Sequence, residues 1–302
     1  MTKDVSSSAW VTGASGFIGG HVVSSLRAVG VEAISLREAL EGGGLVANAR
    51  ACSAQDLLAL GTVPQLIVHC GGSTAVRASF DDPVQGLSDT LGQTGELLEF
   101  IRRCGALVRF VYMSSSAVYG DTTAPRDETS PIAPVSPYGL HKAMCEDLLR
   151  FYGAVHGVTS AVLRPFSVYG AGQRKQLLWD ALCRFQRGEH RFDGGADNVR
   201  DFIDVRDVAA LAVCAAAAAS DEVPVFNAST GQGTSVRELL AVLHRLSGST
   251  SSLEFGNAVW PGDPRMLVGL NTRARALGWA PKVALGDGLA DVVRWFRGLG
   301  PS

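Results

Sequence analysis

The sequence predicts an α/β fold: a Rossmann-type, doubly wound parallel sheet with a smaller C-terminal domain interleaved with it. Two observations support this prediction. Short apolar segments alternate with helical segments through the first half of the 302-residue chain, and a glycine-rich turn follows the first apolar segment. Strands of a parallel sheet are joined by crossover helices, which cover both faces of the sheet and leave the strands apolar throughout. Right-handed crossovers then give a doubly wound sheet.

Apolar runs and helical patterns place the elements of the larger domain. The expected strands cover residues 9–12, 33–36, 66–69, 110–114 and 160–163. The expected helices cover residues 19–29, 54–60, 89–103 and 137–155. Each strand segment is a short apolar run, and each helix segment carries a helical pattern of apolar residues. This alternation ends at Arg164.

The remainder of the chain has a different pattern. Residues 165–198 are rich in Gly, Arg and Gln, and we expect loops there with one helix at 176–187. Strand and helix patterns return at 202–219 and 225–227, a helix starts near Ser235 with a capping arrangement of Thr234 or Ser235 with Glu238, and a last amphipathic helix covers 287–297. We therefore expect one domain of residues 1–164 with about 199–227, and a second of residues 165–198 with about 228–302.

Composition excludes several classes of protein. The formal net charge is −2, with 27 basic and 29 acidic residues mixed along the chain, so no basic run indicates binding to nucleic acid or to an anionic membrane. No segment has the pattern of a secretory signal or of a spanning helix. The six cysteines are scattered without a CxxC pair, which favours reduced thiols over disulfides or a metal site. We therefore expect a cytoplasmic protein without a metal.

The glycine-rich turn, TGASGFIG at residues 12–19, predicts a dinucleotide-binding site. Gly13 suits the tight turn, Gly16 lets the backbone approach a pyrophosphate, and Gly19 allows close packing of helix against strand. The pyrophosphate would then lie on the free N–H groups at the helix N-terminus, where the helix dipole also favours an anion. Glycines occur in many strand–helix turns for backbone reasons alone. The place of this turn, after the first strand of a βαβ pattern, favours the functional interpretation.

A tyrosine and a lysine begin the helix expected at 137–155. Tyr138 and Lys142 are four residues apart and therefore lie on one face of that helix. A phenol has a pKa of about 10, and a nearby ammonium lowers it, which suits an acid–base catalyst. Such a pair also occurs by chance on solvated helices. The hydroxyls of residues 114–116, at the end of an expected strand, favour catalysis because they can align a reacting carbonyl oxygen with the phenol.

Together these features resemble the extended short-chain dehydrogenase/reductases, specifically their nucleotide-sugar epimerase/dehydratase branch. The resemblance covers nearly the whole chain and includes further segments: IVHCGG (67–72), SSSAVYG (114–120), LRPFSVYGAGQ (163–173), RDFIDVRDVA (200–209), FNASTGQGTSVREL (226–239) and GWAPKVALGDGL (278–289). So many ordered matches imply the family's fold and an NAD(P)-dependent oxidoreductase. They also imply that the smaller domain is a substrate domain.

The resemblance implies roles for individual residues. Ser115, Tyr138 and Lys142 match the catalytic hydroxyl, the acid–base phenol and its electrostatic partner. The residues implied at the cofactor are Gly13, Ser15, Gly16, Phe17, Ile18, Gly19, Arg37, Cys70, Gly71, Gly72, Tyr138, Lys142 and Pro165. The residues implied at a nucleotide-sugar substrate are Thr74, Ser116, Ser167, Arg200 and Arg265. Arg200 matches a position that often binds the diphosphate, where a planar guanidinium pairs well with phosphate oxygens.

Relatives of this kind often dimerise through a four-helix bundle that includes the tyrosine-bearing helix, and the resemblance therefore implies a homodimer. Leu148, Leu149 and Tyr152 on this helix suit either such a surface or the protein core. We favour the core for these side chains.

Departures from the family pattern bear on the reaction. Arg37 stands at the expected end of the second strand, where NAD-using relatives carry an acid, and an arginine there favours a 2′-phosphate. NADP(H) is therefore favoured and NAD(H) is possible, unless Arg37 is simply a solvated strand end. Ser116 and Ala117 replace the Asp-Glu pair of the 4,6-dehydratases, which argues against elimination of water. Ala117 also replaces the cysteine of GDP-fucose synthase, which argues against a double epimerase.

Two further departures concern the substrate. Ser167 replaces the usual asparagine, and no arginine precedes the Pro-Gly-Asp of residues 261–263. Arg265 is the candidate to replace that arginine at the phosphates.

These observations lead to three hypotheses. The first is an NADPH-dependent reductase of a nucleotide-linked, dTDP-like 4-keto-6-deoxysugar, with Tyr138 as general acid. The alternative is an NAD-dependent nucleotide-sugar 4-epimerase, which keeps its cofactor and recycles it within each turnover. The third, a non-catalytic dinucleotide sensor, is disfavoured because Tyr138 and Lys142 are both present.

Overall fold

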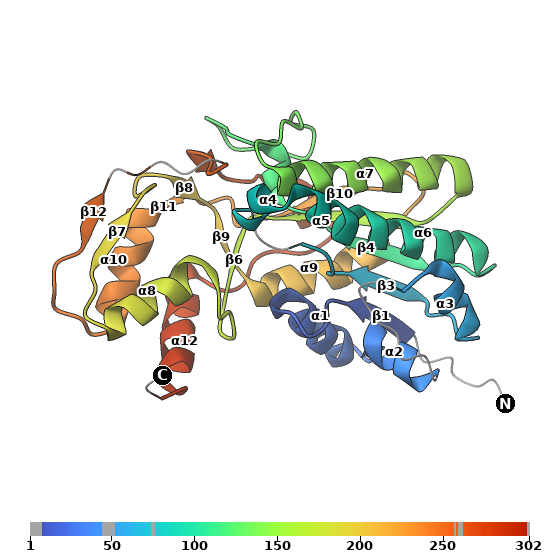
Figure 1. Cartoon of the computed structure of the whole chain (residues 1–302), viewed down its shortest axis with the longest axis horizontal. Coiled ribbons are helices and arrows are strands. Elements are labelled where there is room, and N and C mark those ends of the chain that lie inside the picture. Colours follow the sequence, from blue (N-terminus) through green and yellow to red (C-terminus); the bar gives the residue numbers. More distant parts are fainter. Residues whose placement is uncertain (1–7, 44–51, 74–75, 257, 259–261, 301–302) are drawn as a thin grey trace.

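A computed structural model of the chain describes residues 8–43, 52–73, 76–256, 258 and 262–300. Its centre is a six-stranded, all-parallel sheet with strand order β10-β5-β4-β3-β1-β2 (Figure 1). The strands are β1 (Ser8–Thr12), β2 (Glu32–Ser35), β3 (Leu66–His69), β4 (Arg109–Met113), β5 (Ser160–Pro165) and β10 (Val225–Ala228). The predicted α/β fold with a parallel, Rossmann-like sheet is confirmed.

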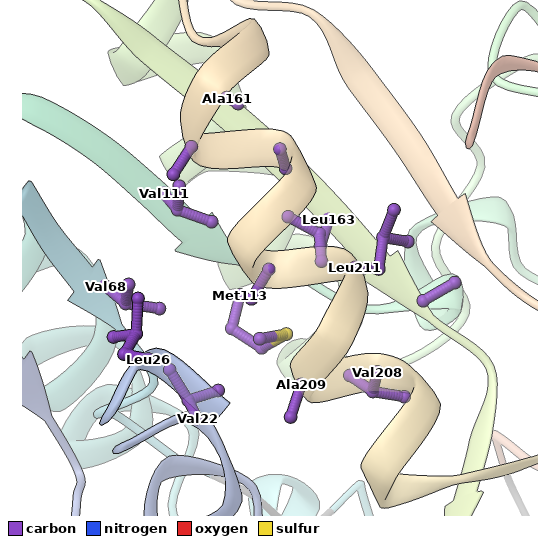
Figure 2. Close-up of a cluster of buried hydrophobic side chains, with 14 of the residues drawn as sticks. Val22, Leu26, Val68, Val111, Met113, Ala161, Leu163, Val208, Ala209 and Leu211 are labelled. Atoms are coloured by element: carbon purple, nitrogen blue, oxygen red, sulfur yellow. The ribbon is translucent and has the colours of Figure 1, made fainter. Parts of the chain in front are cut away.

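Helices cover both faces of this sheet, as Figure 1 shows. One face packs against α1 (Phe17–Ala28) and α9 (Val205–Ala218). The other packs against α2 (Leu36–Gly42), α3 (Ala54–Ala59), α6 (Gln93–Arg103) and α7 (Pro137–His156). Two buried hydrophobic clusters fill these layers, and Figure 2 shows part of the cluster beneath α9. Because successive side chains of a strand point to opposite faces, Val11 joins one cluster and Trp10 the other.

The strand order reverses direction at β1, which places the ligand crevice. β1 pairs with β2 on one side and with β3 on the other, so the chain winds outward in both directions from this point. In open parallel sheets ligands bind beyond the carboxyl ends of the strands at such a switch point. The last residues of β1 and β3, Thr12 and His69, are register partners there.

A smaller lobe lies beyond one end of the sheet, on the left of Figure 1. Its helices are α8 (Gln176–Gln186), α10 (Val236–Leu246) and α12 (Leu285–Arg297), which share a third hydrophobic cluster. Short strands complete it: β7 (Arg191–Asp193) with β12 (Glu254–Gly256), and β8 (Val199–Arg200) with β11 (Thr234–Ser235) and β13 (Met266–Leu267). The expected capping of α10 is confirmed, because Ser235 and Glu238 form a reciprocal capping box.

The remaining elements connect these layers. They are α4 (Ala78–Asp81), α5 (Pro83–Leu87), a π-helical turn (Ser88–Gly92), a 3₁₀ turn (Ser116–Tyr119), β6 (Ser167–Tyr169), β9 (Phe202–Asp204) and α11 (Thr272–Ala276). Strands β6 and β9 pair with each other. Residues Ala274 and Trp279 belong to the cluster beneath α1 and α9, so this part of the C-terminal region packs on the large sheet. The division into two domains at the expected boundaries stays a prediction.

Residues 202–219 form the expected strand and helix, β9 and α9, and the side chain of Asp204 caps the helix. Two other expected segments differ from the structure. The strand expected at 33–36 ends at Ser35, because Ser35 caps α2 in a capping box with Glu38. Arg37 therefore lies in the first turn of a helix, and its expected place at the strand end is wrong. The helix expected at 89–103 begins as the π-helical turn.

Candidate active site

A cleft of about 2190 Å³ lies at the carboxyl ends of the central strands and extends to the small lobe. Pockets for one small ligand usually measure about 300–1,000 Å³. The cleft is therefore large enough for a dinucleotide and a second ligand together. Its walls include the glycine turn, the residues that follow β3 and β4, the start of α7, and the loop before α8.

The glycine turn fits the pyrophosphate of a dinucleotide. Gly13 has φ +64°, and a Cβ there would lie 2.8 Å from the carbonyl oxygen of Cys70. A Cβ on Gly19 would overlap the Gly13 carbonyl, so α1 packs directly on the turn. Gly16 precedes α1 and offers no capping side chain. The first N–H groups of α1 therefore stay available to an anion at the favourable end of the helix dipole.

Local sequence explains how Tyr138 reaches the cleft. Ser136 caps α7 by accepting a hydrogen bond from Gly139 N at 3.1 Å, and Pro137 occupies the first helical position. The backbone N–H of Tyr138 also donates to Ser79 Oγ at 3.1 Å. The start of the helix is thereby fixed from two sides.

The structure brings Ser115, Tyr138 and Lys142 together in the cleft. The Ser115 hydroxyl interacts with the Tyr138 phenol and acts to lower its pKa. Lys142 Nζ lies 6.0 Å from the centre of the Tyr138 ring and donates to the Met113 carbonyl at 2.8 Å. A hydroxyl, a phenol and an ammonium thus meet beside the glycine turn, and this arrangement suits proton transfer to or from a sugar oxygen.

Burial sets the direction of both pKa shifts at the catalytic candidates. It raises the pKa of Tyr138, and the interaction with the Ser115 hydroxyl only partly opposes that shift. It also lowers the pKa of Lys142, while nearby Cys145, Cys70 and Glu146 act in the opposite direction. Tyr138 is therefore a neutral phenol at neutral pH in the protein without a bound dinucleotide. The expectation that Lys142 lowers the pKa of Tyr138 stays a prediction for the complex with the dinucleotide.

The residues expected at the cofactor all line the cleft: Gly13, Ser15, Gly16, Phe17, Ile18, Gly19, Arg37, Cys70, Gly71, Gly72, Tyr138, Lys142 and Pro165. Just beyond the end of β2, Arg37 is 76% exposed and pairs with Glu41 at 2.7 Å. The Glu38 carboxylate accepts the backbone N–H of Ser35 in the capping box. Ser35, Arg37, Glu38 and Glu41 thus all line the cleft at this edge.

The residues expected at the substrate are more dispersed. Ser116, Ser167 and Arg200 line the cleft, and Arg200 forms an ion pair with Asp263. Arg265 is outside the cleft lining and pairs with Asp121 through its backbone N–H at 2.8 Å and its Nε at 3.3 Å. If Arg265 is to bind a substrate phosphate, as the sequence predicts, its side chain must first leave Asp121. Thr74 lies outside the described residues.

The cleft also holds residues that sequence reasoning missed. Arg174 and Lys175 line it before α8, and Phe80 and Leu267 add apolar surface. Arg174 also lies over the Trp179 ring, 5.9 Å from its centre. The sequence offered one indication of Arg174, because this residue directly follows the family segment LRPFSVYGAGQ (163–173).

A buried ion pair adjoins the residues that the sequence predicts to be catalytic. The Glu146 carboxylate accepts hydrogen bonds from Arg164 Nε at 2.9 Å, from Arg164 Nη2 at 2.6 Å and from Ser114 Oγ at 2.6 Å. The side chains of Glu146 and Arg164 are each 1% exposed. Glu146 follows Lys142 by one helical turn, and Ser114 precedes Ser115. The pair therefore joins α7 to the carboxyl ends of β4 and β5.

Comparison with known proteins assigns the family. The model of the "NAD dependent epimerase/dehydratase family" matches residues 9–229. The chain belongs to this family. A UDP-glucose 4-epimerase of Azospirillum brasilense is 31% identical over 96% of this chain and 92% of its own length. A GDP-6-deoxy-D-mannose reductase of Pseudomonas aeruginosa is 28% identical over 94% of this chain and 95% of its own.

Similar solved structures agree with this assignment, and the two described next contain different cofactors. The UDP-glucose 4-epimerase of Thermus thermophilus in complex with NAD has a TM-score of 0.84 and 29% identity, covering 96% of this chain and 99% of its own. RMD from Pseudomonas aeruginosa complexed with NADPH has a TM-score of 0.82 and 26% identity, covering 97% and 99%. The chain is thus an enzyme of the extended short-chain dehydrogenase/reductase type, related to both epimerases and reductases of nucleotide sugars.

The part of the chain that the structure describes offers neither a metal site nor a spanning helix. No group of three or more His, Cys, Asp or Glu side chains in this part is arranged to hold a metal ion. No helix within the described ranges has the length and apolar character needed to span a bilayer. The expected cytoplasmic location stays a prediction.

Proposed function

We propose that this protein is an NAD-dependent 4-epimerase of a nucleotide sugar such as UDP-glucose. The observation that carries the proposal is the meeting of Ser115, Tyr138 and Lys142 in a cleft large enough for a dinucleotide and a second ligand. Its similarity to 4-epimerases over almost the whole chain supports this choice above the reductase favoured by the sequence alone.

The residues of the cleft have distinct parts in this proposal. The glycine turn would hold the pyrophosphate, and Cys70, Gly72 and Pro165 would lie beside the nicotinamide end. When bound, the dinucleotide supplies the hydride acceptor and donor that chemistry at a sugar carbon requires. To take the proton of the 4-hydroxyl, Tyr138 must first lose its own proton, and the ammonium of Lys142 together with an oxidised nicotinamide would favour that phenolate. Tyr138 would later return the proton, and Ser115 would orient the same oxygen by a hydrogen bond.

A specific observation favours a second candidate, an NADPH-dependent reductase of a nucleotide-linked, dTDP-like 4-keto-6-deoxysugar. Arg37 lines the cleft one residue after the start of α2, with no acid ending β2. A guanidinium pairs well with a 2′-phosphate, whereas an acid at the strand end pairs with the 2′-hydroxyl of NAD. In this candidate Tyr138 donates its proton to the carbonyl oxygen as the hydride arrives.

Release of the bound nucleotide separates the two candidates. We expect denaturation of the purified protein to release NAD, and the native protein to convert UDP-glucose into its 4-epimer without net cofactor consumption. Release of no dinucleotide, together with steady oxidation of NADPH by a dTDP-4-keto-6-deoxyhexose, would instead support the reductase. In that case Arg37→Ala should raise the KM for NADPH about tenfold or more, with NADH unaffected.

We also propose that two copies associate through the exposed face of α7. Leu149 is buried in the core and Leu148 and Tyr152 pack against it, so the expected core position of these side chains is confirmed. A separate apolar stripe stays exposed on the same helix: Leu140, Met144, Phe151 and Val155. Their spacing of four, seven and four residues follows the helical repeat, and apolar side chains gathered on one exposed helix face indicate an association surface.

Charge on this stripe should therefore give monomers. We expect Phe151→Glu to shift the mass in solution from dimer to monomer, because the new carboxylate would be desolvated at the interface. Val29→Glu is the matched control, since Val29 is 60% exposed and follows α1, on the face of the sheet opposite to α7. Light scattering of both variants decides the matter, and a dimer that persists in Phe151→Glu would rule out this face.

A further inference from the structure

A fully buried histidine joins the two strands that flank the cofactor crevice. His69 ends β3, and its Nδ1 lies 2.6 Å from Oγ1 of Thr12, which ends β1. On its other side, His69 Nε2 lies 3.2 Å from Thr94 Oγ1 on α6. Nothing in the proposed chemistry uses His69, although it lies immediately before the cleft-lining residue Cys70.

The partners of these groups fix the direction of every hydrogen bond in the series. The hydroxyl of Thr94 donates to the Thr90 carbonyl at 2.7 Å, so its oxygen must accept from His69 Nε2–H. The Thr12 oxygen accepts the backbone N–H of Gly71 at 2.9 Å, and its own hydrogen is left for His69 Nδ1. A neutral imidazole with its proton on Nε2 satisfies every hydrogen bond in this series.

The surroundings of His69 favour that neutral form. Burial, with a contribution from the charge of Lys142, lowers the pKa of His69 to about 3. A charged imidazole could not accept from Thr12 at Nδ1 and would leave the hydrogen of the Thr12 hydroxyl without this acceptor. The burial of His69 and its hydrogen bonds with Thr12 and Thr94 thus both favour the neutral imidazole.

The hydrogen-bond series holds the backbone that faces the cleft. Gly71 N–H donates to Thr12 Oγ1 at 2.9 Å, and Ser73 N–H donates to Thr90 Oγ1 at 3.3 Å. The backbone at residues 70–73 is therefore hydrogen-bonded to Thr12 and Thr90, and residues 70–72 also line the cleft. It also lies close against the glycine turn, where a Cβ on Gly13 would be 2.8 Å from the Cys70 carbonyl oxygen.

We propose that His69 is a positioning residue, which through Thr12 sets the spacing between the glycine turn and the turn of residues 70–72 and thereby the affinity for the dinucleotide. This role rests on the proposed function, because it concerns the same cofactor. A site whose two backbone walls are fixed in advance binds more tightly, since binding need not order them. His69 itself touches neither the substrate nor the reacting atoms.

Variants of Thr12 test the link without removing a large side chain. Thr12→Val keeps the shape but removes the hydroxyl, leaving Gly71 N–H and His69 Nδ1 without that partner. We expect its dissociation constants for NAD and NADPH to rise about tenfold or more. Thr12→Ser keeps the hydroxyl and should restore wild-type affinity. Ser160→Ala is the matched control, because Ser160 is a buried strand serine whose Oγ has no partner among the described residues.

A spectroscopic measurement keeps the proposal testable if Thr12→Val fails to fold. Nitrogen NMR of the wild-type protein should show His69 neutral at pH 6, with the proton on Nε2. A proton on Nδ1, or equal affinity of folded Thr12→Val and wild type, would overturn the positioning role. A wild-type protein that binds neither NAD nor NADPH would overturn the proposed function itself, which is a distinguishable result.

Discussion

Replacement of Tyr138 by Phe should lower kcat by about 10²–10⁴-fold, the usual contribution of a positioned acid–base group. The ring would still fill its place in the cleft, so binding of the dinucleotide should change little. Only the hydroxyl beside Ser115 would be lost, and no other phenol lines the described cleft. The measurement is the initial rate of 4-epimerisation and of ketosugar reduction, each compared between Tyr138→Phe and the wild type.

Tyr112→Phe is the matched control for this prediction. Tyr112 is fully buried on β4, its hydroxyl lies beside the Cys145 thiol, and Lys142 Nζ lies 4.9 Å from the centre of its ring. Removal of that hydroxyl keeps the ring beneath Lys142 and should leave kcat within about twofold. If Tyr138→Phe likewise kept most of its activity, Tyr138 would not be the acid–base group.

The largest expected effect on stability comes from Glu146→Gln, which should lower the free energy of unfolding by about 3–5 kcal/mol. The substitution leaves the Arg164 guanidinium buried without a carboxylate, although two of its nitrogens bond to Glu146 in the native protein. Burial alone lowers the pKa of Arg164, but the hydrogen bonds and charge of Glu146 more than reverse that shift. Urea unfolding at neutral pH measures the loss.

Two companion variants test the cause of that loss. The double variant Glu146→Leu with Arg164→Met removes both charges and should recover much of the stability, because well-packed apolar residues often replace a buried pair without loss of stability. Arg150→Ala removes only the half-exposed partner of Glu146 and should cost less than about 1 kcal/mol. A loss below about 1 kcal/mol in Glu146→Gln would contradict the importance assigned to the buried pair.

Features encoded by adjacent residues could be predicted from the sequence. The glycine turn follows β1 directly, and the helix of Tyr138 begins where Ser136 and Pro137 place it. The capping box of Ser235 and Glu238 was recognisable for the same reason. These features depend on local backbone geometry, and so periodicity, caps and glycines were enough.

Features that depend on long-range contacts could not be predicted in the same way. Arg265 is paired with Asp121, which is distant in sequence, and no local pattern indicates that pair. The raised pKa of Tyr138 depends on burial by several segments, whereas the sequence indicated only the neighbouring ammonium. Glu146 lies on α7 and its partner Arg164 on β5, so no local pattern in the sequence indicates their buried ion pair.

In the proposed function, Tyr138, Ser115 and Lys142 act on C4 of a nucleotide sugar beside one retained dinucleotide. UDP-glucose carrying deuterium at C4, with the product analysed by NMR, tests this arrangement most directly. We expect the 4-epimer with deuterium retained at C4, because the same hydride is removed and returned. Product that has exchanged C4 deuterium for solvent hydrogen, or protein that releases no dinucleotide and converts no nucleotide sugar, would contradict it.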